Sequence, residues 1–137
     1  MKNLVAILSV FVSAVSLSSV CCMAQSQPEE PPTVTEMAAA EAERLERLLD
    51  LEYWQVFYVD STLQHDYQAM QDEYTALRDA KVSNMSMYIA VQDKWMEKID
   101  STYRKYFTPQ QWKAYLKSGA AKMQKAREKR KAKSEGK

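Results

Sequence analysis

The chain has 137 residues, which bounds it to one small domain, and its formal net charge is only +1. Hydrophobic residues make up 46% and charged residues 27%, but the chain has only two cysteines, two glycines and one histidine. Such counts exclude a Gly-rich phosphate loop and argue against strands joined by tight Gly turns. The composition therefore indicates an all-helical protein.

Residues 1–24 have the layout of a secretory signal peptide. A short basic start precedes an apolar run over residues 4–20, and Cys22 and Ala24 place small residues at the −3 and −1 positions of a cleavage site before Gln25. We therefore expect an exported protein whose signal peptide is cleaved after Ala24, and a periplasmic location in a bacterium with two membranes.

Both cysteines would leave with this segment, which excludes a disulfide framework or a Cys-type zinc site from the mature chain. No second apolar run of about 18 residues exists, so no transmembrane segment is expected after cleavage. The alternative is a lipoprotein anchored at Cys21 or Cys22. It is less favoured because lipid attachment normally follows a small residue, whereas Val20 precedes Cys21.

Residues 25–32 (QSQPEEPP) predict a disordered linker, followed by a helical domain over residues 33–121. Order should begin at Thr33, because Thr33 and Glu36 fit a capping box. The Ala-, Glu- and Leu-rich stretch over residues 37–49 then predicts the first helix. Its expected apolar stripe consists of Leu45, Leu48 and Leu49.

Two longer helices should follow, the first over residues 53–80. The break is expected at residues 82–84, where Ser83 or Asn84 would cap the next helix. Because neither Gly nor Pro marks this break, one uninterrupted helix over residues 53–106 is the alternative. Apolar spacings of three and four residues predict the buried stripes. They are Leu63, Tyr67, Met70, Tyr74 and Leu77 on one helix, and Met85, Tyr88, Trp95, Ile99 and Tyr106 on the other.

A fourth helix has the strongest start signal in the chain. Thr108 is the expected N-cap, Pro109 fits the first helical position, and Gln111 is the capping-box partner. Phe107, just before the cap, can pack back onto the helix that it precedes. Gly119 is a candidate C-cap, although helical character returns after it.

Charge is distributed very unevenly along the chain. Residues 25–79 carry a net charge of −10, whereas residues 117–137 carry nine Lys or Arg and two Glu. Residues 122–137 therefore predict a basic tail, partly helical or disordered, which we interpret as solvated. The functional alternative is contact with anionic lipid headgroups or polyanions, and export argues against a nucleic-acid partner.

The apolar content favours a thin structure. Leu, Ile, Val and Phe account for only 16 of the residues after position 24, whereas Tyr, Trp and Phe total 13 and Met adds six. Aromatic and Met side chains suit thin layers and adaptable surfaces. We expect an all-α fold, an elongated hairpin of long helices with short flanking helices, stabilised as a dimer.

Signals for an enzyme are nearly absent, so we expect no catalytic residue, metal or cofactor. His65 is the single imidazole, which excludes multi-His metal sites and His-based general-base networks within one chain. Asp66, with Asp60 and Asp72 nearby, makes a metal site conceivable on one helix face. We interpret this face as solvated and acidic, and only dimerisation could supply a second His65.

Four apolar residues fall off the predicted stripes and are candidates for an exposed surface that binds partners. Most aromatic and Met residues should simply form the core, but side chains of these types also repack readily against different partners. The four candidates are Trp54, Tyr58, Met87 and Met96.

The segment Phe107-Thr108-Pro109-Gln110-Gln111 resembles the repeated Leu-Thr-x-x-Gln motif of the Spy/CpxP family of periplasmic proteins. A near-match, Leu51-Glu52-Tyr53-Trp54-Gln55, lies 56 residues earlier. Glu52 stands where the family has Thr, and Phe107 where Leu is usual. The resemblance implies a cradle-shaped helical homodimer. It also implies an architectural role, holding helix starts together, for the motif positions Leu51, Gln55, Phe107, Thr108 and Gln111.

Members of this family act as ATP-independent chaperones, envelope-stress modulators or metal-responsive proteins. The sequence therefore predicts an exported, chaperone-like stress protein that holds unfolded or misassembled envelope proteins on an amphipathic helical surface, without nucleotide. One alternative is a dedicated inhibitor or partner of a membrane sensor. Another is a structural helical protein of the cell envelope without chaperone activity.

Overall fold

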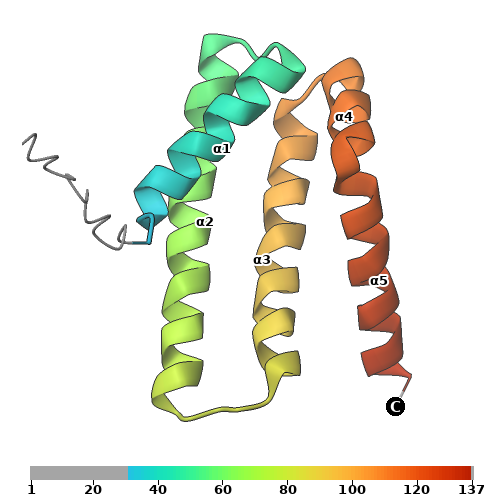
Figure 1. Ribbon diagram of the computed structural model, residues 1–137. Coiled ribbons are helices and arrows are strands. Elements are labelled where there is room, and N and C mark those ends of the chain that lie inside the picture. Colours follow the sequence, from blue (N-terminus) through green and yellow to red (C-terminus); the bar gives the residue numbers. More distant parts are fainter. Residues whose placement is uncertain (1–30, 137) are drawn as a thin grey trace, which may run out of the picture. The chain divides into compact units, whose positions relative to one another are not determined.

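The computed structural model describes residues 31–136, which form an all-α fold as expected (Figure 1). The predicted signal peptide, its cleavage site, the lipidation alternative and nearly all of the predicted linker lie outside these residues. Within residues 31–136, no helix combines the length and the apolarity needed to cross a bilayer. The helices are α1 (Val34–Leu49), α2 (Tyr53–Asp79), α3 (Met85–Tyr106), α4 (Pro109–Tyr115) and α5 (Ala121–Glu135), with a π-helical turn, η1 (Leu116–Ala120), between α4 and α5.

Helix α1 begins at the predicted capping box. The Glu36 amide donates to Thr33 Oγ1 at 3.2 Å, and the Thr33 amide donates to Glu36 Oε2 at 2.7 Å. The helix ends where Asp50 adopts a left-handed conformation with φ of 49°. The predicted stripe is wrong in one position, because Leu48 is 42% exposed. The buried face instead repeats every three or four residues as Ala38, Ala42, Leu45 and Leu49.

Helices α2 and α3 run antiparallel, side by side (Figure 1). The turn between them contains Lys81, whose φ is 54°, and Asn84 caps α3 by accepting a hydrogen bond from the Ser86 amide at 3.0 Å. The alternative of one uninterrupted helix is therefore wrong. A short polar side chain that caps the next helix makes the break without Gly or Pro.

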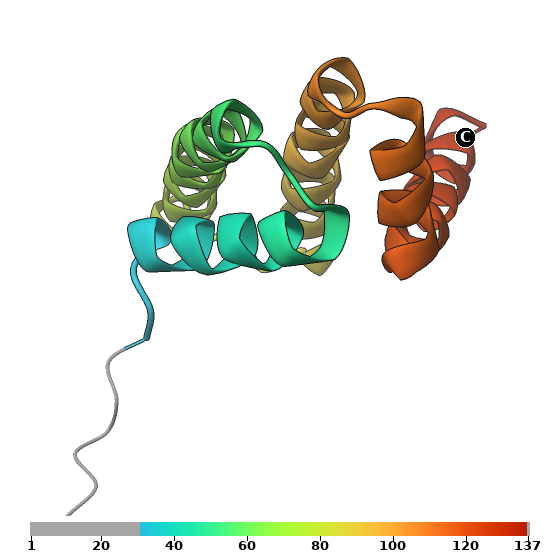
Figure 2. The same cartoon turned by 90° about the horizontal axis from the view of Figure 1, so that it is seen from above.

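The core lies at one end of the α2–α3 pair. Helix α1 packs against α2 and also contacts α4 (Figure 2), so four helices contribute buried side chains there. No described residue between positions 67 and 98 is buried. The stripe residues Met70, Tyr74 and Leu77 are consequently only half-buried, and Met85 is exposed. The buried apolar residues of the core are Ala38, Ala42, Leu45, Leu49, Leu51, Val59, Leu63, Ile99, Tyr103, Phe107 and Tyr115.

Thr108 caps α4, with Pro109 in the first turn and with the complete capping box to Gln111, as predicted. Gly119 does not end the helical run. Its φ of 115° lies within η1, which joins α4 to α5 across a kink. Most of the predicted basic tail is thus the helix α5, which lies beside α3 but has no buried residue of its own.

Candidate binding surfaces

Aromatic rings gather where α2 begins. The Tyr58 ring stacks on the Tyr106 ring of α3, with centroids 4.8 Å apart and an interplanar angle of 16°. Trp54 meets both rings edge-on at 6.3 and 6.5 Å, and Phe57 meets Tyr58 edge-on at 5.6 Å. These distances and angles are typical of favourable aromatic pairs, so the rings hold one another in place. We call these four residues, Trp54, Phe57, Tyr58 and Tyr106, together with the adjacent exposed Tyr53, the aromatic cluster.

Four of these five side chains face solvent to a large extent. Tyr53 is 91% exposed, Phe57 63%, Trp54 46% and Tyr58 44%. The Trp54 indole N–H donates to the Glu52 carboxylate at 2.6 Å, so its polar atom is satisfied without burying the ring. Neighbouring exposed rings on one helical segment mark a candidate site for binding an apolar partner. Trp54 and Tyr58 were predicted from the sequence, whereas Tyr53 and Phe57 were not, although the dense run of aromatic residues at positions 53–58 was a signal.

The other two predicted contact residues lie elsewhere. Met87 is near the start of α3, at the opposite end of the α2–α3 pair, where it borders a groove between α3 and α5. Met96 is half-buried and packs against the core. The structure therefore brings Trp54 and Tyr58 together in one cluster and places Met87 and Met96 outside it.

The five residues of the two motif segments lie together although the segments are 56 residues apart. The Gln55 side-chain amide donates to Gln111 Oε1 at 2.8 Å, and the Gln111 amide donates back to Gln55 Oε1 at 2.9 Å. Each glutamine oxygen also accepts the backbone N–H that precedes its own helix, from Glu52 and Thr108, both at 2.9 Å. This reciprocal pair joins the N-terminus of α2 to that of α4.

Apolar and backbone contacts complete this junction. Gln55 donates to the Tyr106 carbonyl at 2.8 Å, at the end of α3. Leu51 is buried in the core, and Phe107 stacks on Tyr103 with centroids 5.0 Å apart. Tyr115 meets Tyr103 edge-on at 5.6 Å. Tyr103 and Tyr115 were not predicted as core residues, because neither lies on a predicted stripe.

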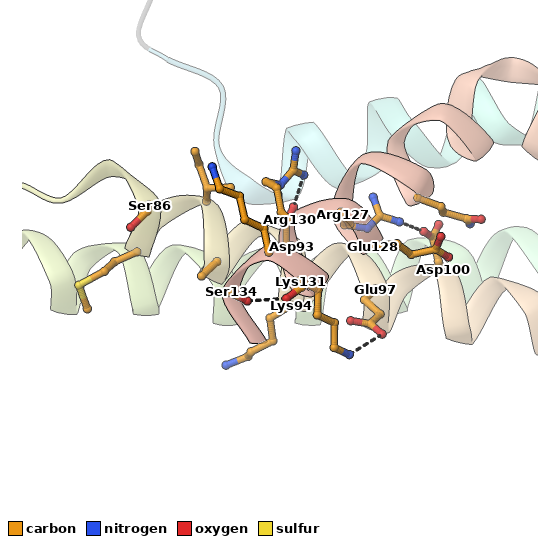
Figure 3. Close-up of a pocket in the computed structure, with 15 residues that line it drawn as sticks. Ser86, Asp93, Lys94, Glu97, Asp100, Arg127, Glu128, Arg130, Lys131 and Ser134 are labelled. Carbon is orange, nitrogen blue, oxygen red and sulfur yellow. Dashed lines mark hydrogen bonds and ion pairs between the residues drawn. The ribbon is translucent and has the colours of Figure 1, made fainter. Parts of the chain in front are cut away.

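A groove of about 850 Å³ runs between α3 and α5 (Figure 3). Met87, Ile89 and Ala90 of α3 contribute apolar surface to it. Ion pairs cross it at three levels and tie α5 to α3. They join Arg127 to Asp100, Arg130 to Asp93 at 2.6 Å, and Lys131 to Glu97 at 3.7 Å.

The Asp100 pair is the most buried of the three. The carboxylate is only 9% exposed and Arg127 only 11%, and the Tyr115 hydroxyl donates to Asp100 Oδ1 at 2.6 Å. A buried charge needs such partners to offset the loss of hydration. Burial raises the pKa of Tyr115 far above its ordinary value of 10, and the hydrogen bond to Asp100 adds to this effect. Burial likewise raises the pKa of Tyr103, whose hydroxyl has no hydrogen-bond partner among the described residues.

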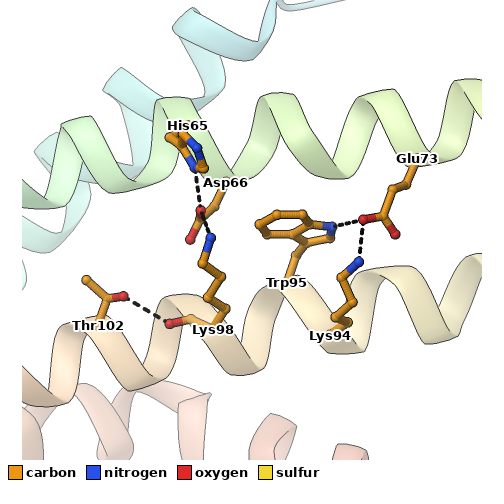
Figure 4. A network of polar contacts seen from close by, with 7 residues as sticks. All are labelled: His65, Asp66, Glu73, Lys94, Trp95, Lys98 and Thr102. Atoms are coloured by element: carbon orange, nitrogen blue, oxygen red, sulfur yellow. Dashed lines mark hydrogen bonds and ion pairs between the residues drawn. The ribbon is translucent and has the colours of Figure 1, made fainter.

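The conceivable metal site does not assemble. His65 Nδ1 lies 2.8 Å from Asp66 Oδ1, but that oxygen also accepts from Lys98 Nζ at 2.9 Å (Figure 4). Asp60 and Asp72 instead accept hydrogen bonds from neighbouring glutamines on α2. Residues 31–136 contain no group of three His, Cys, Asp or Glu side chains arranged to hold a metal ion.

A second polar contact lies farther along the same helix pair. Glu73 of α2 pairs with Lys94 of α3 and accepts the Trp95 indole N–H at 3.1 Å (Figure 4). The Lys98 ammonium lies over the Trp95 ring, 4.5 Å from its centroid. The polar contacts of Glu73 thus join α2 to α3 where few apolar side chains are available, and the cation–π contact within α3 packs Lys98 against the Trp95 ring.

Comparisons of the chain with protein-family models, with curated proteins and with solved structures find no significant match.

Proposed function

We propose that this chain is an exported, ATP-independent holding protein of the Spy/CpxP type. It keeps unfolded or misassembled envelope proteins from aggregating by binding them on an exposed apolar surface. The observation that carries the proposal is the aromatic cluster, where four rings between 44% and 91% exposed project from one helical segment. Such rings bind apolar segments of many sequences because the hydrophobic effect is not directional.

The size of the cluster suits weak and reversible binding. Full burial of one large apolar side chain contributes about 1.5–3 kcal/mol, and the exposed part of each ring offers only a fraction of that. Association also costs translational and rotational freedom, which offsets much of the gain. The expected result is micromolar affinity for many clients, and no step of this binding requires nucleotide.

The motif junction supports the choice of family. The two glutamines of the Leu-Thr-x-x-Gln-like segments bond to each other and to the backbone at the starts of α2 and α4. The glutamine of each segment therefore does more than cap its own helix, because it also bonds to the other segment. The proposal includes the cradle-like hairpin and the homodimer that the family resemblance implies. Light scattering at tens of micromolar tests the dimer, and a monomer mass would contradict it.

The test of function is suppression of aggregation. The protein lacking residues 1–24 is added, without nucleotide, to several unrelated proteins diluted from denaturant, while light scattering is followed. We expect suppression near equimolar ratio for all clients. The double variant Tyr53→Ser/Phe57→Ser should weaken suppression several-fold, because these two rings are the most exposed of the cluster.

The matched control is Met37→Ser/Met123→Ser, which also removes two exposed apolar side chains but from other helices. Equal loss in both variants would show that general surface apolarity acts, and would contradict a role for the aromatic cluster. No suppression by the parent protein for any client would contradict the holding function. A dedicated sensor partner or a structural envelope role would then be tested by pull-down from envelope extract.

A further inference from the structure

The cations of α5 include one set that pairs with α3 and another set on a different face of the helix. Arg127, Arg130 and Lys131 face α3 and are engaged by Asp100, Asp93 and Glu97. The α3 carboxylates therefore neutralise the inner face of α5. Because the Arg127 pair is almost fully buried, it also fixes how the helix is turned about its own axis.

Three further lysines of α5 form no ion pair with any described residue and do not line the groove. Their spacings of three and four residues place them along one side of the helix, opposite Arg127. All three are exposed, and no carboxylate interrupts the row at these spacings. From first to last the row extends over roughly 10 Å of helix axis. This lysine stripe consists of Lys122, Lys125 and Lys129. Lys133 is also exposed, but it lines the groove beside α3.

The chemistry of the stripe points to a surface rather than to a single ligand. A lysine ammonium is a flexible point charge, whereas arginine provides the planar fork that recognises one phosphate or one base edge. Both arginines of α5 form ion pairs with carboxylates of α3, and the set that faces away from α3 contains only lysines. Helix α5 also has no aromatic side chain on which a base could stack, which disfavours single-stranded nucleic acid.

We propose that the lysine stripe docks this protein onto a membrane surface rich in anionic phospholipid. A straight row of exposed lysines can lie flat against a plane of lipid phosphates, with each lysine contributing to the attraction. The kink at Gly119 and the Arg127–Asp100 pair hold α5 against the folded domain, so the stripe is presented as one surface. This docking is independent of the proposed holding function, because it uses neither the aromatic cluster nor the motif junction.

The test is flotation with lipid vesicles. The protein lacking residues 1–24 is mixed with two kinds of vesicle, at low and at physiological salt. One kind is pure phosphatidylcholine, and the other also contains about 30–40% of the anionic lipid phosphatidylglycerol. We expect binding only to the anionic vesicles and much weaker binding at the higher salt. The triple variant Lys122→Gln/Lys125→Gln/Lys129→Gln should lose about 100-fold in partition coefficient, on the basis of the usual contribution per lysine.

The matched control is Lys81→Gln/Lys105→Gln/Lys113→Gln. It removes the same charge from exposed lysines that also lack ion pairs with described residues, but that lie outside α5. None of the six substitutions touches the ion pairs that hold α5, and circular dichroism checks that helix content is unchanged. The control variant should keep most of its vesicle binding.

Three outcomes would overturn the proposal. Equal loss in both triple variants would mean that only net charge matters. Absence of binding to anionic vesicles at low salt would mean that the stripe is merely solvated. Tighter binding of the stripe to duplex DNA than to vesicles at the same salt would assign it to a nucleic acid instead. Competition by soluble inorganic phosphate distinguishes a site for single phosphates from a site that requires a lipid surface.

Discussion

The two ends of the α2–α3 pair are held together in different ways. At the motif end, α1 and α4 add to the pair, and the chain concentrates its buried side chains there, including Leu45, Leu63, Tyr103 and Phe107. At the distal end, near the α2–α3 turn, no residue between positions 67 and 98 is buried. Contacts there are made by half-buried rings, such as Tyr74 against Tyr88 at 6.0 Å, and by ion pairs.

The difference shows how a chain with few aliphatic residues can hold long helices together. Burial of apolar surface is the main stabilising term, and this chain has enough for one compact junction. The long helices then extend beyond that junction, with polar and aromatic contacts in place of a core. A thin distal region leaves its apolar side chains, such as Met85 and Met87, accessible to solvent.

Truncating one leucine at each end should give the largest difference in stability. Leu63 is fully buried, so Leu63→Ala should lower the free energy of unfolding by about 2–5 kcal/mol. Leu77 lies on the same helix but is only half-buried, at the distal end. Leu77→Ala should therefore lower the free energy of unfolding by only about 1 kcal/mol. Urea denaturation followed by circular dichroism measures both. Equal losses would contradict the division into a packed end and a thin end.

Local signals made the helix starts predictable. Thr33, Asn84 and Thr108 each cap a helix through bonds to a residue two or three positions away, so the sequence alone contains the information. The buried stripe of α2 could not be predicted in this way. Its buried positions include Gln55 and Asp66, and apolar periodicity passes over polar residues whose partners, Gln111 and Lys98, come from other helices.

The position of α5 could not be predicted for the same reason. A run of basic residues without an apolar face is usually solvated, and nothing local indicates that Arg127 meets a buried carboxylate. That contact requires Asp100 of α3 to face Tyr115 of α4 and Arg127 of α5. Of the candidate binding residues, Trp54 and Tyr58 were predictable because they lie off the apolar stripe. Their stacking on Tyr106 depends on how α2 meets α3.

Removing the reciprocal glutamine pair should give the next largest loss of unfolding free energy. Gln55→Ala deletes a buried amide and leaves the Glu52 N–H, the Tyr106 carbonyl and Gln111 without their partner. We expect a loss of about 2–3 kcal/mol in unfolding free energy, because buried polar groups without partners are costly.

A double-mutant cycle with Gln111→Ala isolates the contact between the two glutamines. The coupling energy should be about 1 kcal/mol, as is usual for residues in one hydrogen-bond network. The control is Gln68→Ala on the exposed face of α2, where only a bond to Asp72 is lost, and it should change stability by less than about 0.5 kcal/mol. Additive effects of Gln55→Ala and Gln111→Ala would show that the pair does not join the two helix starts.

The smallest expected changes in unfolding free energy come from removing the hydroxyl group of two tyrosines at the motif end. The two substitutions should differ in their effect. Tyr115 donates to Asp100, so Tyr115→Phe should cost about 1.5 kcal/mol in unfolding free energy. Tyr103 is buried, and its hydroxyl has no partner among residues 31–136. Tyr103→Phe should therefore leave stability unchanged or raise it slightly. Thermal unfolding of the two variants side by side distinguishes them.

The pH dependence of stability gives an independent check on Tyr103. Burial raises its pKa far above 10, so the folded state keeps the proton at a pH where the unfolded state loses it. The resulting stabilisation is complete below about pH 10 and declines as the pH rises above that value. Tyr103→Phe removes one titrating group and should flatten the alkaline loss of unfolding free energy between about pH 9 and 11. An unchanged slope would mean that the Tyr103 hydroxyl reaches solvent, and the motif end would then be no better packed at this position than the distal end.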